Sequence, residues 1–171
     1  MSVRTDRVLQ DAIGDPAVRE RYEAKIWHGG PHECWYWLGA IHPHGHGRFW
    51  VGSVRLSPGR RRDVVVIAHR FGWALAHGLD ALRDVPVLAH DCDEPSCQNP
   101  EHGVPGTTAS NYEDWLYRRW MPRSPLRDRR GPAGRARAIR DVLLAGGDTA
   151  ALAAVKEAGV TGLDQDQMTL W

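Results

Sequence analysis

Apolar and polar residues alternate with two different periods along this chain, which predicts a mixed α+β fold. Two-residue alternation and short β-branched runs favour strands, whereas apolar residues three or four positions apart favour helices. Asp15 followed by Pro16 marks the start of one helix, and Gly78 marks the end of another. The expected elements are one or two lead-in helices within 5–26, strands at 48–54, 64–67 and 85–89, and helices at 69–77 and 108–120.

The chain changes character at about residue 122. Pro122, Pro125 and Pro132 stand among arginines, and this composition predicts an extended linker. Beyond it, one-face spacing of apolar residues predicts helices at 133–145 and 149–158. The expected parts are a helical lead-in at 1–30, a main domain at 31–121, and an arginine-rich linker with a helical extension at 122–171. Whether the extension contacts DNA or docks on the main domain is open at this point.

The net charge of +1 points to no nucleic-acid partner by itself, but the arginines are unevenly distributed. Two basic clusters could follow a phosphate backbone, although solvated loops would show the same composition. The candidate DNA contacts are Arg55, Arg60, Arg61, Arg62, Arg118, Arg119, Arg123 and Arg127. No apolar run approaches the roughly 20 residues of a membrane span, and no signal-like segment opens the chain. We therefore expect a cytoplasmic protein with no membrane partner.

The cysteines predict a metal site rather than a set of disulfides, because the chain holds only 3 of them. Cys92, Cys97 and His102 follow a C-x4-C-x4-H spacing in a polar segment that has little core in which to bury thiols. Structural zinc takes four tetrahedral ligands, and Cys34 is the remaining thiol, so a Cys3His site would use every cysteine. Binding free energies of about 10–16 kcal/mol would let zinc determine the fold of this region. The alternative is three buried reduced thiols and a surface histidine.

A histidine and an asparagine near the expected zinc loop, residues 91–102, have the chemistry that phosphodiester hydrolysis needs. His90 ends the strand that enters this loop, and an ordinary histidine pKa near ~6.5 suits a general base that deprotonates water. Asn111 lies early in the following helix and offers a hard oxygen to Mg²⁺, which would complete its shell with phosphate oxygens and waters. Each residue taken alone also has a structural explanation, as a packed histidine or as a helix cap. The combined arrangement favours catalysis.

Several longer pieces of sequence carry a family resemblance. They are CWYWLGA at 34–40, GHGRF at 45–49, AHRFGWALAHG at 68–78, HDCDEPSCQNPEH at 90–102 and GTTASN at 106–111. In this order they resemble the phage-type HNH endonucleases, and the HDCDEPSCQNPEH core also resembles the His-Cys box homing endonucleases; both belong to the His-Me finger superfamily. The chain departs from the family pattern at His46, where an aromatic residue is usual, and at Gly103, where an apolar residue is usual.

The resemblance implies an α+β fold built on a ββα-metal core. In that core His90 would activate water and Asn111 would hold a catalytic Mg²⁺, for which Mn²⁺ could substitute. The implied ligands of a structural zinc ion are Cys34, Cys92, Cys97 and His102. Asn99 matches the position at which the family braces the loop through backbone hydrogen bonds. For Arg48 and Arg70, in the GRF and HR pieces, contact with the scissile phosphate and a surface salt bridge are both open.

These observations favour a metal-dependent DNA endonuclease, in the cytoplasm of a bacterial host if a phage encodes it. An alternative of another class is a zinc-stapled DNA-binding or phage packaging accessory protein, which would not need both His90 and Asn111. A structural module that binds protein through its tryptophans is a third hypothesis, but packing in the core and the zinc loop explains the 8 tryptophans more simply. The sequence does not decide between a monomer and a homodimer, or between nicking and double-strand cutting.

Overall fold

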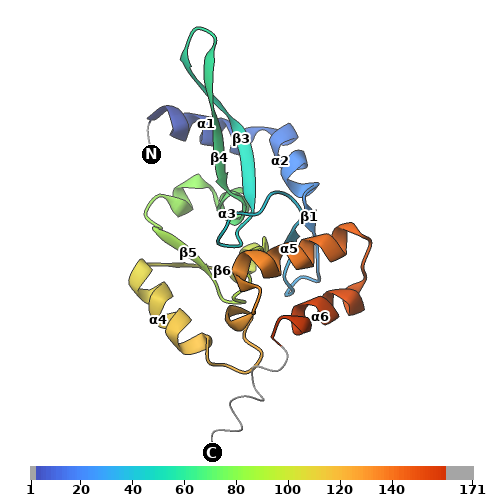
Figure 1. The fold of residues 1–171 in the computed structure, drawn as a ribbon. Helices are drawn as coiled ribbons and strands as arrows, with labels where there is room; N and C mark the ends of the chain where they lie inside the picture. The colour runs from blue at the N-terminus through green and yellow to red at the C-terminus, as the bar shows by residue number, and fades with distance from the viewer. Residues whose placement is uncertain (1–2, 161–171) are drawn as a thin grey trace, which may run out of the picture.

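The structure is a computed structural model that describes residues 3–160, and it confirms the mixed α+β class. Small two-stranded sheets occupy the middle of the chain, and helices surround them (Figure 1). The helices are α1 (Val3–Gly14), α2 (Pro16–Glu23), α3 (Ala68–His77), α4 (Thr108–Arg118), α5 (Gly131–Leu144) and α6 (Thr149–Ala158), with 3-10 turns η1 (Leu79–Leu82), η2 (Pro100–His102) and η3 (Pro125–Arg127). The strands are β1 (Ile26–Trp27), β2 (Tyr36–Trp37), β3 (Arg48–Ser57), β4 (Arg60–Ile67), β5 (Val87–His90) and β6 (Gly103–Gly106).

The longest sheet is the antiparallel β3–β4 hairpin, whose tip extends away from the body of the molecule (Figure 1). Near the body its side chains pack into the core, with Phe49 paired to Val66. Gly59 has a φ of +73° in the turn, a conformation that glycine adopts without strain. The outer half of the hairpin is polar and exposed. It carries Arg55, Arg60, Arg61 and Arg62.

An aromatic cluster joins the lead-in helices to the main sheet region. The rings of Tyr22, Trp37, Phe49 and Phe71 are buried, and neighbouring ring centroids lie 4.9 to 5.9 Å apart. The Tyr22 hydroxyl donates a buried hydrogen bond of 3.0 Å to the side-chain oxygen of Gln98. The segment expected as a separate lead-in at 1–30 therefore shares its core with the main domain.

The strands β5 and β6 form a short antiparallel hairpin, and α4 follows it directly. His90, the last residue of β5, pairs with Gly103, the first residue of β6. A Cβ atom at Gly103 would lie 2.7 Å from the ring of Trp73, so the absence of a side chain there lets this tryptophan pack against the hairpin. The departure from the family pattern at this position thus has a packing explanation.

Helix α4 begins where the sequence predicts, but its aromatic residues are not buried. Thr107 caps it, and Ser110 returns the hydrogen bond in a capping box. No residue of α4 is buried, and Tyr117 and Trp120 are 72% and 59% exposed. The expectation that the tryptophans serve only the core and the zinc loop is therefore wrong for this region.

The C-terminal helices form a hairpin that docks on the zinc-loop side of the molecule. Ile139, Leu143 and Leu152 form one buried cluster with Tyr36 of β2. The segment between α4 and α5 is not the extended linker that we expected, because it contains η3 and buries Ser124 and Asp128. Of the two alternatives left open for the extension, the structure shows that it docks on the main domain. Residues 161–171 of the expected extension lie outside the described part of the chain. None of the helices described is long and apolar enough to cross a membrane.

Candidate metal centre and active site

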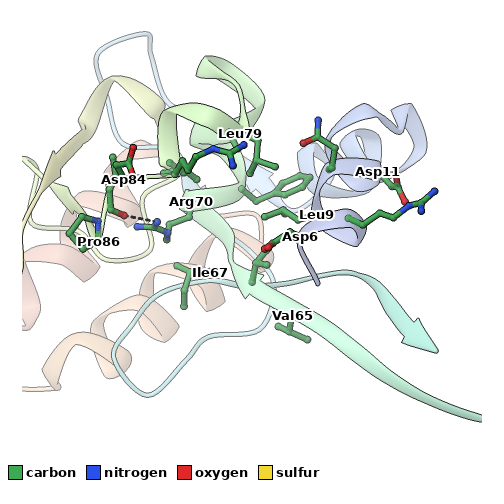
Figure 2. Close-up of a pocket in the computed structure, with 17 residues that line it drawn as sticks. Asp6, Leu9, Asp11, Val65, Ile67, Arg70, Leu79, Asp84 and Pro86 are labelled. Carbon is green, nitrogen blue, oxygen red and sulfur yellow. Dashed lines mark hydrogen bonds between the residues drawn. The ribbon is translucent and has the colours of Figure 1, made fainter. Parts of the chain in front are cut away.

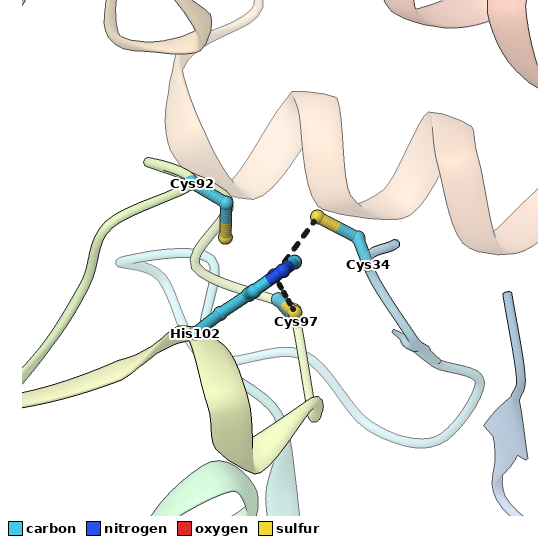
Figure 3. A group of neighbouring side chains, drawn as sticks. All are labelled: Cys34, Cys92, Cys97 and His102. Carbon is cyan, nitrogen blue, oxygen red and sulfur yellow. Dashed lines mark hydrogen bonds between the residues drawn. The ribbon is translucent and has the colours of Figure 1, made fainter. Parts of the chain in front are cut away.

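Four side chains from distant parts of the chain converge on one point, as predicted (Figure 3). One ligand atom from each of Cys34, Cys92, Cys97 and His102 lies within 4.8 Å of the other three. The Nδ1 atom of His102 lies 3.7 Å from the sulfur of Cys34 and 3.5 Å from that of Cys97. A tetrahedral zinc ion with ordinary bond lengths places sulfur and nitrogen ligands about 3.6 Å apart. The cluster therefore has the donor set and the spacing to bind a metal ion such as zinc.

Hydrogen bonds of the Asn99 side chain hold the zinc loop against the backbone of the segment that precedes β2 and supplies Cys34. The side-chain amide of Asn99 donates to the carbonyl oxygens of Pro31 at 2.9 Å and Glu33 at 2.8 Å, and its oxygen accepts from the backbone N–H of Glu101 at 3.0 Å. The Asn99 residue is buried, so these bonds are partly shielded from water. It therefore has the geometry of the bracing residue that the resemblance implies.

The surroundings of the cluster favour one ionised thiolate, that of Cys34, and one histidine tautomer. The Nε2–H of His102 donates to the carbonyl of His32 at 3.2 Å, which leaves Nδ1 as the ligand nitrogen. The backbone N–H of Asn99 donates to the Cys97 sulfur at 3.4 Å. Hydrogen bonds from the Cys92 and Cys97 thiols lower the pKa of Cys34 to about 2, and the negative charge raises the pKa of both donors. A divalent cation would let all three thiols ionise together.

His90 stands beside this cluster with one nitrogen engaged and the other free. Its Nε2 lies 3.2 Å from the carbonyl oxygen of Cys97, and since a carbonyl only accepts, Nε2 carries the proton. Burial of the ring, with a smaller contribution from His46, lowers the pKa of His90 to about 4. The imidazole is thus neutral at neutral pH, with the lone pair of Nδ1 available as a base.

Two further histidines surround His90, and our sequence analysis did not single them out as site residues. The ring of His69 meets that of His90 edge to face at a centroid distance of 4.3 Å, and the ring of His46 is stacked on it at 6.0 Å. Burial lowers the pKa of His46, and it lowers that of His69 further. The only sequence signals were the histidine-rich turn at 42–46 and the histidine of the HR piece.

Asn111 does not join this group through any contact among the described residues. It lies exposed on the first turn of α4, where its backbone N–H donates to the carbonyl of Thr107 at 3.0 Å. The helix is connected to the zinc loop at its other end: Arg118 donates to the carbonyl of Asp91 at 2.6 Å and pairs with Asp93 at 3.1 Å. The structure therefore groups His90 with His46 and His69, and leaves Asn111 free to meet a ligand from solvent.

The two arginines for which phosphate contact was left open differ in burial. Arg48 is exposed at the start of β3. Arg70 points into a pocket between α1, β4 and α3, where its guanidinium donates to the carbonyl of Val85 at 2.9 Å (Figure 2). Burial in this pocket lowers the pKa of Arg70. The structure thus engages the Arg70 guanidinium with a backbone carbonyl of the chain.

The candidate DNA contacts divide into an exposed group and a group engaged within the fold. The four arginines of the β3–β4 hairpin are exposed. Arg118 is paired as described, Arg123 pairs with Glu157 at 3.1 Å, and Arg119 stacks over the rings of Trp115 and Trp120. Arg127 ends the turn η3, where its N–H donates to the carbonyl of Ser124 at 3.0 Å. The hairpin is therefore the stronger candidate for a phosphate-binding surface.

Comparison with known proteins gives two relatives from one phage. Protein 2.8 of Escherichia phage T7 is 35% identical over 83 residues, which cover 48% of this chain and 49% of that protein. Protein 7.7 of the same phage is 31% identical over 87 residues, which cover 49% of this chain and 55% of that protein. The chain spans about half the length of these curated relatives. No protein-family profile matches the chain, and no solved structure matches it.

Proposed function

We propose that the protein is a metal-dependent DNA endonuclease of the HNH type within the His-Me finger superfamily, with β5, β6 and α4 as its ββα-metal core. One observation carries the proposal: His90 presents a neutral imidazole whose Nε2–H is fixed on the Cys97 carbonyl and whose Nδ1 has a free lone pair. The T7 relatives support a phage setting, and we place the protein in the cytoplasm of a bacterial host.

The proposed reaction is hydrolysis of one phosphodiester bond. His90 Nδ1 takes a proton from water, the resulting hydroxide attacks phosphorus, and the ester bond to the leaving oxygen breaks as that oxygen gains a proton from solvent. Asn111 offers a hard amide oxygen at an exposed position, which suits Mg²⁺ whose other ligands are phosphate oxygens and waters. When bound there, Mg²⁺ or Mn²⁺ supplies charge stabilisation at the phosphate.

The chain's own residues supply the remaining parts of this mechanism. The zinc cluster fixes the loop that holds His90, since the carbonyl that orients His90 belongs to the ligand Cys97. Arg55, Arg60, Arg61 and Arg62 on the β3–β4 hairpin would follow the DNA backbone, and Arg48 lies at its base. Affinity for DNA should then fall steeply with salt concentration.

A supercoiled-plasmid assay with Mg²⁺, Mn²⁺ or EDTA tests the proposal. His90→Ala should lose about 100- to 10,000-fold of the cleavage rate, the usual contribution of a general base. The variant should still fold, because the Cys97 carbonyl also accepts from the side-chain amide of Gln98 at 3.0 Å. Asn111→Ala should lower the rate and raise the Mg²⁺ concentration needed for half-maximal cleavage. Wild-type cleavage by a correctly folded His90→Ala variant would remove this residue from the mechanism.

A second candidate function is a zinc-stapled DNA-binding or packaging accessory protein. The observation that favours it is the exposed position of Asn111, whose side chain makes no hydrogen bond to the described residues. Such a protein would retard DNA in a gel, with the same dependence on the hairpin arginines, and would leave the plasmid intact with every divalent cation.

A further inference from the structure

The three histidines around the proposed base form a second set of potential metal ligands. One ring nitrogen from each of His46, His69 and His90 lies within 4.8 Å of the other two. They come from three separate elements: the turn before β3, the first turn of α3 and the end of β5. This set shares no side chain with the cysteine cluster.

Each ring has one nitrogen committed to a backbone carbonyl. His46 Nδ1 lies 3.0 Å from the Pro95 oxygen, His69 Nε2 lies 3.2 Å from the Leu88 oxygen, and His90 Nε2 lies 3.2 Å from the Cys97 oxygen. Because carbonyls only accept, these nitrogens carry the protons. The remaining nitrogens, Nε2 of His46 and Nδ1 of the other two, are therefore all acceptors. Metal-binding histidines show this same pattern of a second nitrogen held by a backbone carbonyl.

His69 provides an independent sign that a ligand is needed. Its side chain is buried, with 8% of the residue exposed, and its Nδ1 atom has no hydrogen-bond partner. Buried polar atoms in proteins nearly always have a partner. The neighbouring rings cannot supply one, because their free nitrogens also lack hydrogen atoms. A cation at the centre of the group would satisfy all three nitrogens at once.

We propose that His46, His69 and His90 form a second metal site, selective for a late first-row transition ion such as Zn²⁺, Co²⁺ or Ni²⁺ and distinct from the Cys3His site. Neutral imidazoles bind these ions well and bind Mg²⁺ poorly. Metal–nitrogen bonds of about 2.0–2.1 Å place tetrahedral ligands about 3.4 Å apart, so nitrogens that lie 4.8 Å apart need to approach by about 1.4 Å. Small rotations of the imidazole rings can provide this.

The site has a regulatory consequence that rests on the proposed nuclease function. An ion bound at this site uses the Nδ1 lone pair of His90, which the reaction needs as its base. Transition ions should therefore inhibit cleavage, because they occupy the lone pair that must accept the proton from water. Mg²⁺ should not inhibit in this way, because it binds imidazole poorly. His46 gives this chain the third ligand, at the position where the resemblance leads us to expect an aromatic residue.

Metal titration of the zinc-loaded protein tests the site without any reference to cleavage. Protein holding one zinc ion per chain is titrated with Co²⁺ in an absorption spectrometer, and with Ni²⁺ in a calorimeter. We expect a second equivalent whose cobalt spectrum shows d–d bands but no sulfur-to-cobalt charge transfer. In His46→Phe this binding should weaken by more than about 100-fold, since loss of an outer partner alone costs 10- to 100-fold.

His44→Ala is the matched control, because it removes an exposed histidine two positions away in the same turn. It should bind both equivalents as the wild type does. A wild-type protein that takes up no second equivalent would overturn the site. A second equivalent of undiminished affinity in His46→Phe, or one that shows sulfur charge transfer, would also overturn it.

A plasmid assay then tests the inhibitory consequence. For each variant the measured quantity is the ratio of Mg²⁺-supported rates with and without Zn²⁺ at a concentration that fills the second site. We expect the ratio to fall at least about tenfold in the wild type and in His44→Ala, and to stay near one in His46→Phe. Equal inhibition of all three proteins would refute the regulatory role. A protein that binds the second ion but cuts no DNA under any condition would refute the proposed function and leave the site standing.

Discussion

The C-terminal hairpin is held to the zinc loop by one buried arginine, and its removal gives a sharp test of the fold. Arg135 of α5 is 3% exposed, and its side chain forms hydrogen-bonded ion pairs with Glu94 of the zinc loop and with Asp128. It also donates to the carbonyl of Lys156 at 2.9 Å. Burial alone would lower the pKa of Arg135, but hydrogen bonds to Glu94 and Asp128 raise it above its ordinary value. The buried guanidinium of Arg135 therefore has acceptors from three residues in the folded protein.

The substitution Arg135→Met keeps much of the side-chain volume and leaves Glu94 as a buried carboxylate without its partner. Breaking a buried ion pair on one side costs about 3–5 kcal/mol, which is a large part of the 5–15 kcal/mol of ordinary domain stability. For a chain of this size the melting temperature should fall by roughly 6 to 20 °C. The second substitution, Glu94→Gln, removes the stranded charge, so the double variant should recover part of the loss.

Thermal and urea unfolding of the zinc-loaded proteins, followed by circular dichroism, measures these differences. Arg137→Met is the control, because Arg137 lies on the same helix two positions away and is exposed. It should change the free energy of unfolding by less than about 0.5 kcal/mol. If Arg135→Met unfolds within 1 kcal/mol of this control, the ion pairs do not hold the hairpin and the reasoning fails.

Two further variants examine the zinc loop. Cys97→Ser should lower both the zinc content, measured by elemental analysis, and the melting temperature, because it removes one of four ligands; full zinc with full stability would point to another ligand set. Asn99→Ala should lose about 2–4 kcal/mol, since it removes a cap acceptor and two donors, and should weaken zinc binding about 10- to 100-fold. Asn99→Asp keeps the acceptor alone, so a variant as stable as the wild type would show that the donors to Pro31 and Glu33 contribute nothing.

Local signals in the sequence were sufficient for most helices and for the zinc ligands. Asp15 caps the helix whose start it was expected to mark, since capping depends on neighbouring residues only. The spacing of Cys92, Cys97 and His102 lies within one loop, and Cys34 followed from the number of ligands that zinc requires. The strand β6 was missed because its sequence, GVPG, holds residues that are unfavourable in strands.

Features that depend on tertiary packing could not be predicted. His46 and His69 meet His90 only because α3 packs against the turn before β3 and against β5, and no sequence spacing records this. The arginine-rich segment at 122–132 was taken for an extended linker because the partners of its residues, such as the Val155 carbonyl for Arg130, are far away in the chain. The exposed aromatic side of α4 follows the expected helical spacing, but spacing alone does not show whether a helix face is covered.

The positions of the four candidate metal ligands along the chain also bear on how the protein is made. An ion that joins Cys34 to His102 closes a loop that contains the whole β3–β4 hairpin, α3 and β5. Loop-closure entropy assigns about 4 kcal/mol to a cross-link of this span. During synthesis this stabilisation cannot act until His102 has left the ribosome, so the nascent thiol of Cys34 must stay reduced and unpaired while the hairpin and α3 emerge.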